Sequence, residues 1–169
     1  MTQSFETVFG SQELLAGIID KSPRPSYLLK PSSTNQANML LDMSGRGEYS
    51  SPIKFNVVRE HGKVSEGDYV HCMYFYITHD EEKLFTSQMN KIFAAKDIYS
   101  GMSGMFLGKA ADDQIQYLLL SSWENSTDFF TMKETPAFTP LRQFTTRAAS
   151  SGGYHETGYK VLAPSEYRD

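Results

Sequence analysis

Residues 69–78 read YVHCMYFYIT, and this stretch decides the fold. It is rich in aromatic and branched side chains, which is typical of a β-strand. Side chains along a strand alternate between two faces, so His71, Met73, Phe75 and Ile77 share one side. A polar connector, HGKVSEGD at residues 61–68, separates this strand from the preceding chain. We therefore expect residues 69–78 to begin a new structural unit.

The segments after this strand follow the ferredoxin-like order. Residues 79–96 predict a helix, with acidic residues in its first turn and Lys96 near its end, as the helix dipole favours. Residues 101–110 and 114–123 flank the turn residues ADD and predict a hairpin. Two helical pieces follow, at 125–134 and from about Pro136, before a last strand within 150–163. The order β-α-β-β-α-β predicts an α+β, ferredoxin-like fold.

The chain before residue 62 predicts a smaller set of elements. Strands are expected at 4–10, 26–30, 37–43 and 52–60. A helix is expected at 12–22, capped by Ser11, with Leu14, Leu15, Ile18 and Ile19 as its apolar stripe. We therefore divide the chain into a β-α-β-β-β extension at residues 1–62 and a ferredoxin-like domain at residues 66–169.

Composition narrows the functional classes. The chain has 169 residues, of which 40% are apolar and 21% are charged, as in soluble globular proteins. Its net charge of -4 gives no electrostatic basis for binding nucleic acid or a membrane surface. Cys72, the sole cysteine, cannot form an internal disulfide or a thiolate metal site by itself. Because no signal peptide is predicted either, we expect a cytoplasmic protein.

The segment LLLSSWENSTDFF, residues 118–130, contains the single tryptophan of the chain. Trp123 ends an apolar strand, and polar residues that can start a helix follow at once. The ring could anchor the core, or it could form the wall of a pocket at the mouth of a barrel. The 10 tyrosines and 11 phenylalanines of the chain suit either role, because aromatic rings build both cores and apolar ligand cavities.

The order of elements and three short segments resemble the antibiotic biosynthesis monooxygenase (ABM) superfamily. These segments are YLLK after a proline, GDYV at the entry to the central strand, and LLSSWE. The whole chain is similar to bacterial heme-degrading monooxygenases that carry an N-terminal addition. The resemblance implies ferredoxin-like units that pair into a dimeric α/β barrel, and hence a homodimer. It also implies heme as both substrate and cofactor, without a separate flavin or metal.

In the heme-degrading branch, three residues define the site: an Asn near the bound oxygen, a Trp that distorts the porphyrin, and a His that ligates the iron. Trp123 matches the Trp, whereas the Asn falls at Met73 and the His at Arg142. A thioether cannot donate a hydrogen bond, and a guanidinium has no lone pair for iron. Heme turnover is therefore expected to be weak or absent, and no cofactor is firmly predicted.

The candidate site residues follow from this resemblance and from the alternation of the central strand. Trp123 and His71 are the catalytic candidates, while Met73, Phe75, Arg142 and Trp123 are the ligand-binding candidates. His71 would point into the same cavity as Met73, although a lone histidine is more often a structural hydrogen-bonding residue. Arg142 is either a solvated helix residue or the partner of an acidic or phenolic ligand group. No histidine spacing indicates a metal site.

Two functional classes remain open. The first is an ABM-type monooxygenase acting on heme or another aromatic ligand in a barrel cavity. A route without cofactor requires a substrate that can itself give an electron to oxygen, in a pocket that excludes water. The second is a non-catalytic binding or sensing protein that has kept the fold and lost the chemistry. The predicted partners are a second copy of the chain and a small aromatic or porphyrin ligand.

Overall fold

The computed structural model describes residues 3–21, 26–45, 47, 49–50, 52–95, 97, 99–112, 115–150 and 154–167, and gives no side-chain description for 147–150. Within them the strands are β1 (Ser4–Gly10), β2 (Ser26–Pro31), β3 (Asn38–Asp42), β4 (Ile53–Gly62), β5 (Tyr69–Tyr76), β6 (Met102–Ala110), β7 (Gln116–Trp123) and β8 (Tyr154–Val161). The helices are α1 (Gln12–Lys21), α2 (Glu82–Ala94), α3 (Ser126–Lys133), α4 (Arg142–Ser150) and α5 (Pro164–Tyr167), with 3-10 turns η1 (His79–Glu81) and η3 (Thr139–Leu141). The element order predicted for both parts of the chain is confirmed.

The strands form one closed antiparallel barrel in the order β1-β3-β2-β8-β5-β7-β6-β4. The central strand β5 lies between β7 and β8, as a ferredoxin-like unit requires. Two further pairings, β2 with β8 and β4 with β6, join the N-terminal strands to that unit. The barrel therefore closes within a single chain, and not between two chains as the resemblance had implied.

The barrel interior explains this closure. One face of the ferredoxin-like sheet presents Cys72 and Leu120, which pack against Phe5, Leu29 and Phe55 from the N-terminal strands. All five side chains are fully buried. In a dimeric barrel the sheet of a second chain would cover this face, but here residues of the same chain already cover it. Dimerisation stays a prediction, but burial of this face does not require it.

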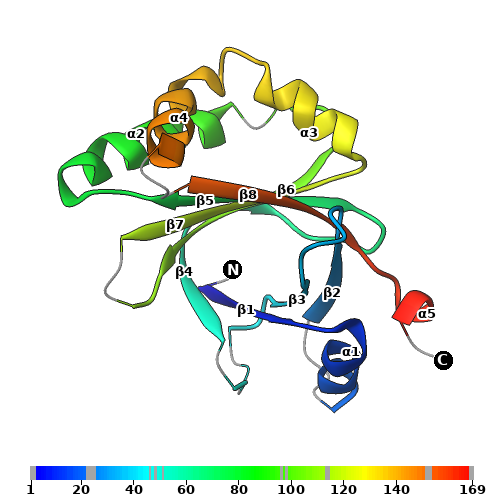
Figure 1. Cartoon of the computed structure of the whole chain (residues 1–169). Helices are drawn as coiled ribbons and strands as arrows, with labels where there is room; N and C mark the ends of the chain where they lie inside the picture. Colours follow the sequence, from blue (N-terminus) through cyan, green and yellow to red (C-terminus); the bar gives the residue numbers. More distant parts are fainter. Residues whose placement is uncertain are drawn as a thin grey trace.

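The opposite face of β5, β6, β7 and β8 is covered by α2, α3 and α4 (Figure 1). Asn125 fixes the start of α3, because its side-chain oxygen accepts a hydrogen bond from the Asp128 backbone N–H at 3.1 Å. Phe85 of α2 and Phe129 of α3 are fully buried against the sheet. The sheet thus has two separate apolar layers, one inside the barrel and one beneath these helices.

Helix α1 packs against the outside of the N-terminal strands, on the side away from α2, α3 and α4 (Figure 1). Ser11 caps it as expected, by accepting a hydrogen bond from the Leu14 backbone N–H at 3.2 Å. Leu15 and Ile19 are buried, but Leu14 is 57% exposed and does not belong to the buried stripe predicted for this helix. Among the described helices, none is long and apolar enough to cross a membrane.

Candidate functional site

The residues predicted to surround a barrel cavity lie on the other face of the sheet. Met73, Phe75 and Trp123 belong to the apolar layer under α2, α3 and α4. His71 shares their face, since its ring stacks on Phe129 of α3 with ring centroids 3.8 Å apart. The alternation of β5 was predicted correctly, but its assignment to the barrel interior was wrong. The interior side of β5 carries Val70, Cys72 and Tyr74 instead.

Trp123 is fully buried in this layer. Its ring packs edge-to-face on Phe129, with centroids 5.9 Å apart, and lies 6.5 Å from the ring of Tyr99. The indole Nε1 has no hydrogen-bond partner among the described residues. Trp123 lines neither of the two pockets described below. Its position matches a core anchor, which was one of the two roles left open by the sequence.

The residues at two of the three heme positions do not fit heme. Met73 is buried, and its thioether offers no hydrogen-bond donor. The Arg142 side chain is 56% exposed and lies 3.6 Å from the Glu134 carboxylate, so it points to solvent at the start of α4. Phe129, whose ring contacts that of Trp123, and Phe144 belong to the same buried cluster as Trp123 and Met73. The guanidinium at position 142 offers no lone pair to iron.

His71 is the centre of a polar network within the helix-facing layer. The Tyr69 hydroxyl lies 2.7 Å from its Nδ1, and a Glu156 carboxylate oxygen lies 3.2 Å from its Nε2. Glu156 also accepts hydrogen bonds from the Tyr154 hydroxyl at 2.7 Å and from Lys133 Nζ at 3.1 Å. Both ring nitrogens of His71 are thus occupied by protein partners, which favours the structural role for this residue.

The network fixes the charge of Glu156. The hydrogen bond from His71 lowers the pKa of the Glu156 carboxyl to about 2, against its partial burial, with further help from Tyr154 and Lys133. Burial and the nearby Glu156 charge raise the pKa of Tyr69 to about 12. Glu156 is therefore an anion at neutral pH, while Tyr69 stays protonated. Through Glu156 the network links Lys133 of α3 to His71 of β5, so it helps to hold α3 on the sheet.

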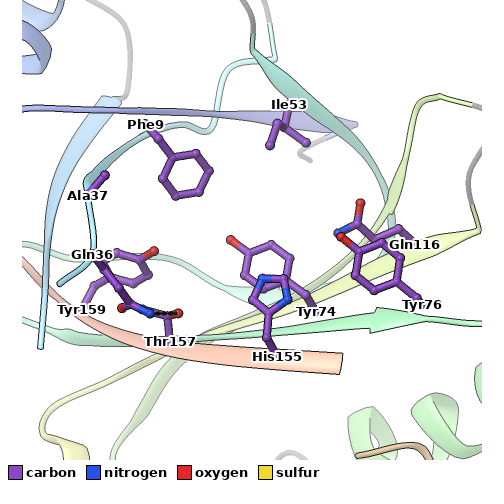
Figure 2. A pocket seen from close by; sticks show the side chains of 10 residues that line it. All are labelled: Phe9, Gln36, Ala37, Ile53, Tyr74, Tyr76, Gln116, His155, Thr157 and Tyr159. Carbon is purple, nitrogen blue, oxygen red and sulfur yellow. Dashed lines mark hydrogen bonds between the residues drawn. The ribbon is translucent and has the colours of Figure 1, made fainter. Parts of the chain in front are cut away.

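A pocket of about 320 Å³ opens at one end of the barrel (Figure 2). It is built by both halves of the chain, since its walls come from β1, β4, β5, β7, β8 and the segment before β3. The lining residues are Phe9, Gln36, Ala37, Ile53, Tyr74, Tyr76, Gln116, His155, Thr157 and Tyr159. Aromatic rings dominate this lining, as an aromatic ligand would require.

The floor of this barrel-mouth pocket is polar and buried. Tyr74, Gln116 and Tyr159 are 5%, 9% and 3% exposed. Figure 2 shows the hydroxyl groups of Tyr74 and Tyr159 directed toward the space below Phe9. The Tyr74 hydroxyl shares a side-chain hydrogen bond with the Cys72 thiol. Burial raises the pKa values of both phenols, so both hydroxyl groups keep their protons at neutral pH.

The rim of the pocket is more open and carries its one imidazole. His155 stacks on Tyr74, with ring centroids 4.4 Å apart and planes 16° from parallel. Beside it, Gln36 donates a hydrogen bond to Thr157 at 3.2 Å (Figure 2). Desolvation lowers the pKa of His155, which keeps the imidazole neutral at neutral pH. A neutral imidazole beside a cavity can accept a proton from a bound ligand.

Sequence reasoning missed this pocket because it sought the site on the strand at residues 69–78 and around Trp123, and assigned no site residue to the last strand. The structure places His155 in β8, where His155, Thr157 and Tyr159 alternate on the inward face. The same period of two was present in the sequence YHETGYKV and could have revealed the face. The preceding glycines, which indicated a flexible turn, lie outside the described residues.

A second, shallower hollow lies on the surface beside α2. Its lining residues are His79, Glu82, Lys83, Thr86 and Tyr117. Glu82 accepts hydrogen bonds from Lys109 at 2.5 Å and from Tyr117 at 2.6 Å, which lower its pKa. The protein itself thus supplies the hydrogen-bond partners of Glu82, and we interpret the hollow as ordinary solvated surface. Across the described residues, no group of three or more His, Cys, Asp or Glu side chains could hold a metal ion.

No family model matches the sequence, and no curated protein matches it either. Solved structures do match. An uncharacterized ferredoxin-fold protein related to antibiotic biosynthesis monooxygenases, from Listeria monocytogenes, gives a TM-score of 0.83 at 17% identity and covers 96% of each chain. The heme-degrading enzyme LmHde from the same organism gives a TM-score of 0.78 at 18% identity, and the match covers 94% of this chain and 99% of the LmHde chain. A major regulator of staphylococcal pathogenesis gives a TM-score of 0.78 at 16% identity, and the match covers 95% of this chain and 99% of the regulator.

These identities are low, so the likeness establishes the fold and leaves the chemistry open. The matched structures include both a heme-degrading enzyme and a regulator. Over nearly its whole length, this chain has the ferredoxin-like fold of proteins related to the antibiotic biosynthesis monooxygenases.

Proposed function

We propose that this protein is a cofactor-free monooxygenase that oxidises a small, electron-rich aromatic compound in the barrel-mouth pocket. The observation that carries the proposal is the pairing of an aromatic cavity with a neutral imidazole, His155, stacked on Tyr74 at its rim. The fold shared with proteins related to antibiotic biosynthesis monooxygenases supports the reaction class.

Heme is not the substrate in this proposal, although heme degradation is the activity of one matched structure. Met73 is a buried thioether that donates no hydrogen bond, and Arg142 cannot ligate iron. An aromatic of two or three fused rings suits the barrel-mouth pocket better, because about 320 Å³ lies at the low end of the roughly 300–1,000 Å³ found for small-molecule pockets.

The residues of the pocket suit the first step of such a reaction. His155 accepts a proton from a hydroxyl or activated C–H group of the substrate, and the resulting anion is electron-rich enough to transfer an electron to molecular oxygen. Recombination of the two radicals forms a C–O bond, and loss of water from the hydroperoxide leaves one oxygen atom on the substrate. The substrate loses two hydrogen atoms, which leave with the second oxygen atom as water.

Oxygen uptake tests this proposal. The protein is mixed with hydroxylated naphthalenes and anthracenes, with catalase present, and oxygen consumption is followed with an electrode. We expect protein-dependent uptake and incorporation of one labelled atom from ¹⁸O₂. His155→Gln should lower kcat by about 10²-fold or more, because general base catalysis contributes roughly 10²–10⁴-fold. His61→Gln, on β4 and outside the pocket, is the matched control. Equal rates for the two variants would overturn the role of His155.

A non-catalytic binding role is the second candidate. It is favoured by the mismatch at positions 73 and 142, and by the likeness to a regulator of staphylococcal pathogenesis. Tight binding of the same aromatic compounds without any oxygen uptake would select this role over the oxygenase.

A further inference from the structure

His155, the imidazole at the rim of the barrel-mouth pocket, receives no hydrogen bond at either ring nitrogen from the described residues. His71 differs, because Tyr69 and Glu156 hold both of its ring nitrogens. A histidine that acts as a general base is usually oriented by a second group bonded to its other ring nitrogen. In this pocket, the orientation of the imidazole has to come from another kind of contact.

No ion pair orients the imidazole either. The lining residues include no Asp, Glu, Lys or Arg, and their other titratable groups are the phenols of Tyr74, Tyr76 and Tyr159. Glu156, the next residue along β8, faces the helices on the other side of the sheet, where Lys133 of α3 donates a hydrogen bond to it. Ring contacts are therefore what remains to fix the position of His155.

The closest ring contact of His155 is with Tyr74. The two rings stack with centroids 4.4 Å apart and planes 16° from parallel, whereas the ring of Tyr76 lies 6.4 Å away and is tilted by 34°. Tyr74 lies directly opposite His155 in the register of β5 with β8, so the backbone of two central strands sets the contact. Figure 2 shows the imidazole beside the Tyr74 ring at the edge of the pocket. The stack defines the plane of the imidazole and leaves both nitrogens unbonded.

Tyr74 is a rigid support for this stack. Its side chain is only 5% exposed and belongs to the apolar cluster inside the barrel. Its hydroxyl shares a hydrogen bond with the Cys72 thiol, two residues earlier on β5. His155 itself is exposed at the rim. Because close-packed interiors restrict side-chain movement, the buried phenol limits the conformations open to the exposed imidazole.

We propose that Tyr74 is a positioning residue, whose ring holds the His155 imidazole in the orientation from which it accepts the proton of the substrate. The inference rests on the proposed function, since it assigns the support of the base in the same reaction. Tyr74 acts through its ring and not through its hydroxyl, which is bonded to Cys72. Correct placement matters because a displacement of about 1 Å can lower a catalytic rate by roughly 10²-fold.

Proton NMR of the imidazole tests the stack itself. The ring current of Tyr74 should move the ring-proton signals of His155 upfield of those of an exposed histidine. The chain has 4 histidines, and the His155 signals are identified as those missing from His155→Gln. Tyr74→Leu should abolish the upfield shift, and Tyr74→Phe, which keeps the ring, should retain it. Tyr159→Leu is the matched control, because it removes another buried ring of the lining without removing the ring stacked on His155.

Kinetics of oxygen uptake with a hydroxylated naphthalene tests the role in the reaction. Tyr74→Leu should lower kcat about tenfold or more, and Tyr74→Phe should stay within about twofold of the native protein. In the His155→Gln background, Tyr74→Leu should lower kcat by less than about twofold further, because residues that act as one unit are not additive. A Tyr74 ring that only stabilised the fold or contacted the substrate would lower kcat equally in both backgrounds.

Three results would overturn the inference: no upfield shift for His155 in the native protein, an upfield shift that persists in Tyr74→Leu, or equal effects of Tyr74→Leu on kcat with and without His155. The first result needs no variant, so the inference stays testable even where Tyr74→Leu does not fold. The expected NMR shifts without any oxygen uptake would confirm that Tyr74 positions His155 and would overturn only the oxygenase activity.

Discussion

Replacing Glu156 by glutamine should destabilise the protein in a pH-dependent manner. The native carboxylate accepts hydrogen bonds from His71, Tyr154 and Lys133, which hold its pKa at about 2 instead of 4.5. At 1.36 kcal/mol per unit, this difference corresponds to about 3 kcal/mol at neutral pH. The side chain is 30% exposed, and solvent screening reduces the expected loss to roughly 1–2.5 kcal/mol.

The sign of the pH dependence follows from the lowered pKa. The stabilisation by Glu156 is fully present above the pKa of the unfolded chain, near 4.5, and is lost as the pH falls toward 2. The difference in unfolding free energy between native protein and Glu156→Gln should therefore shrink by up to about 1 kcal/mol between pH 7 and pH 4.

Urea unfolding at pH 7, 5 and 4, followed by circular dichroism, measures this difference. Glu134→Gln is the matched control, since Glu134 is 77% exposed and pairs with Arg142 at the surface. Its effect should stay within about 0.5 kcal/mol at every pH. If Glu156→Gln destabilised the protein equally at pH 7 and pH 4, the carboxylate charge would not be what stabilises this network, and the argument would fail.

Three further predictions follow from other parts of the structure. Trp123→Ala should lower the unfolding free energy by about 3–5 kcal/mol, but it should leave the affinity for hydroxylated naphthalenes unchanged, because Trp123 lies on the far face of the sheet from the pocket. Gly158→Ala should cost about 1–3 kcal/mol in urea unfolding, because a Cβ there would lie 2.2 Å from the Tyr69 hydroxyl; a loss below 0.5 kcal/mol would contradict this contact. Oxygen uptake should fall at acidic pH as His155 gains its proton, with a midpoint below the ordinary 6.5, and a midpoint above 6.5 would exclude His155 as the base.

Element order and strand alternation could be predicted because each is a local property of the sequence. The stretch from Tyr69 to Tyr76 alternates as a strand in the structure, and Asn125 begins the helix expected after Trp123. Barrel closure could not be predicted from such patterns. An apolar sheet face looks the same in sequence whether a second chain or the strand containing Phe5 covers it.

The candidate site was predicted less well, for a related reason. A period of two shows that His71 and Met73 share a face, but it cannot show which face lines the cavity when both are buried. Here both faces are apolar, because helices cover one and the N-terminal strands cover the other. Two residues of the pocket, Tyr74 and His155, are 81 positions apart in sequence, and only the register of β5 with β8 brings them together.

The pairing of β2 with β8 affects how the chain reaches its folded state. Leu29 of β2 lies opposite Val161 of β8. The edge of β2 that faces β8 therefore stays unpaired until β8, the last strand, has been synthesised. Contacts between residues so distant in sequence form slowly, because a long loop must close before the pairing gains any energy. During synthesis, the inward side chains of β1 to β4 stay without their final partners until β6 and β8 have left the ribosome. A growing chain of this kind is open to aggregation and to chaperones over most of its synthesis.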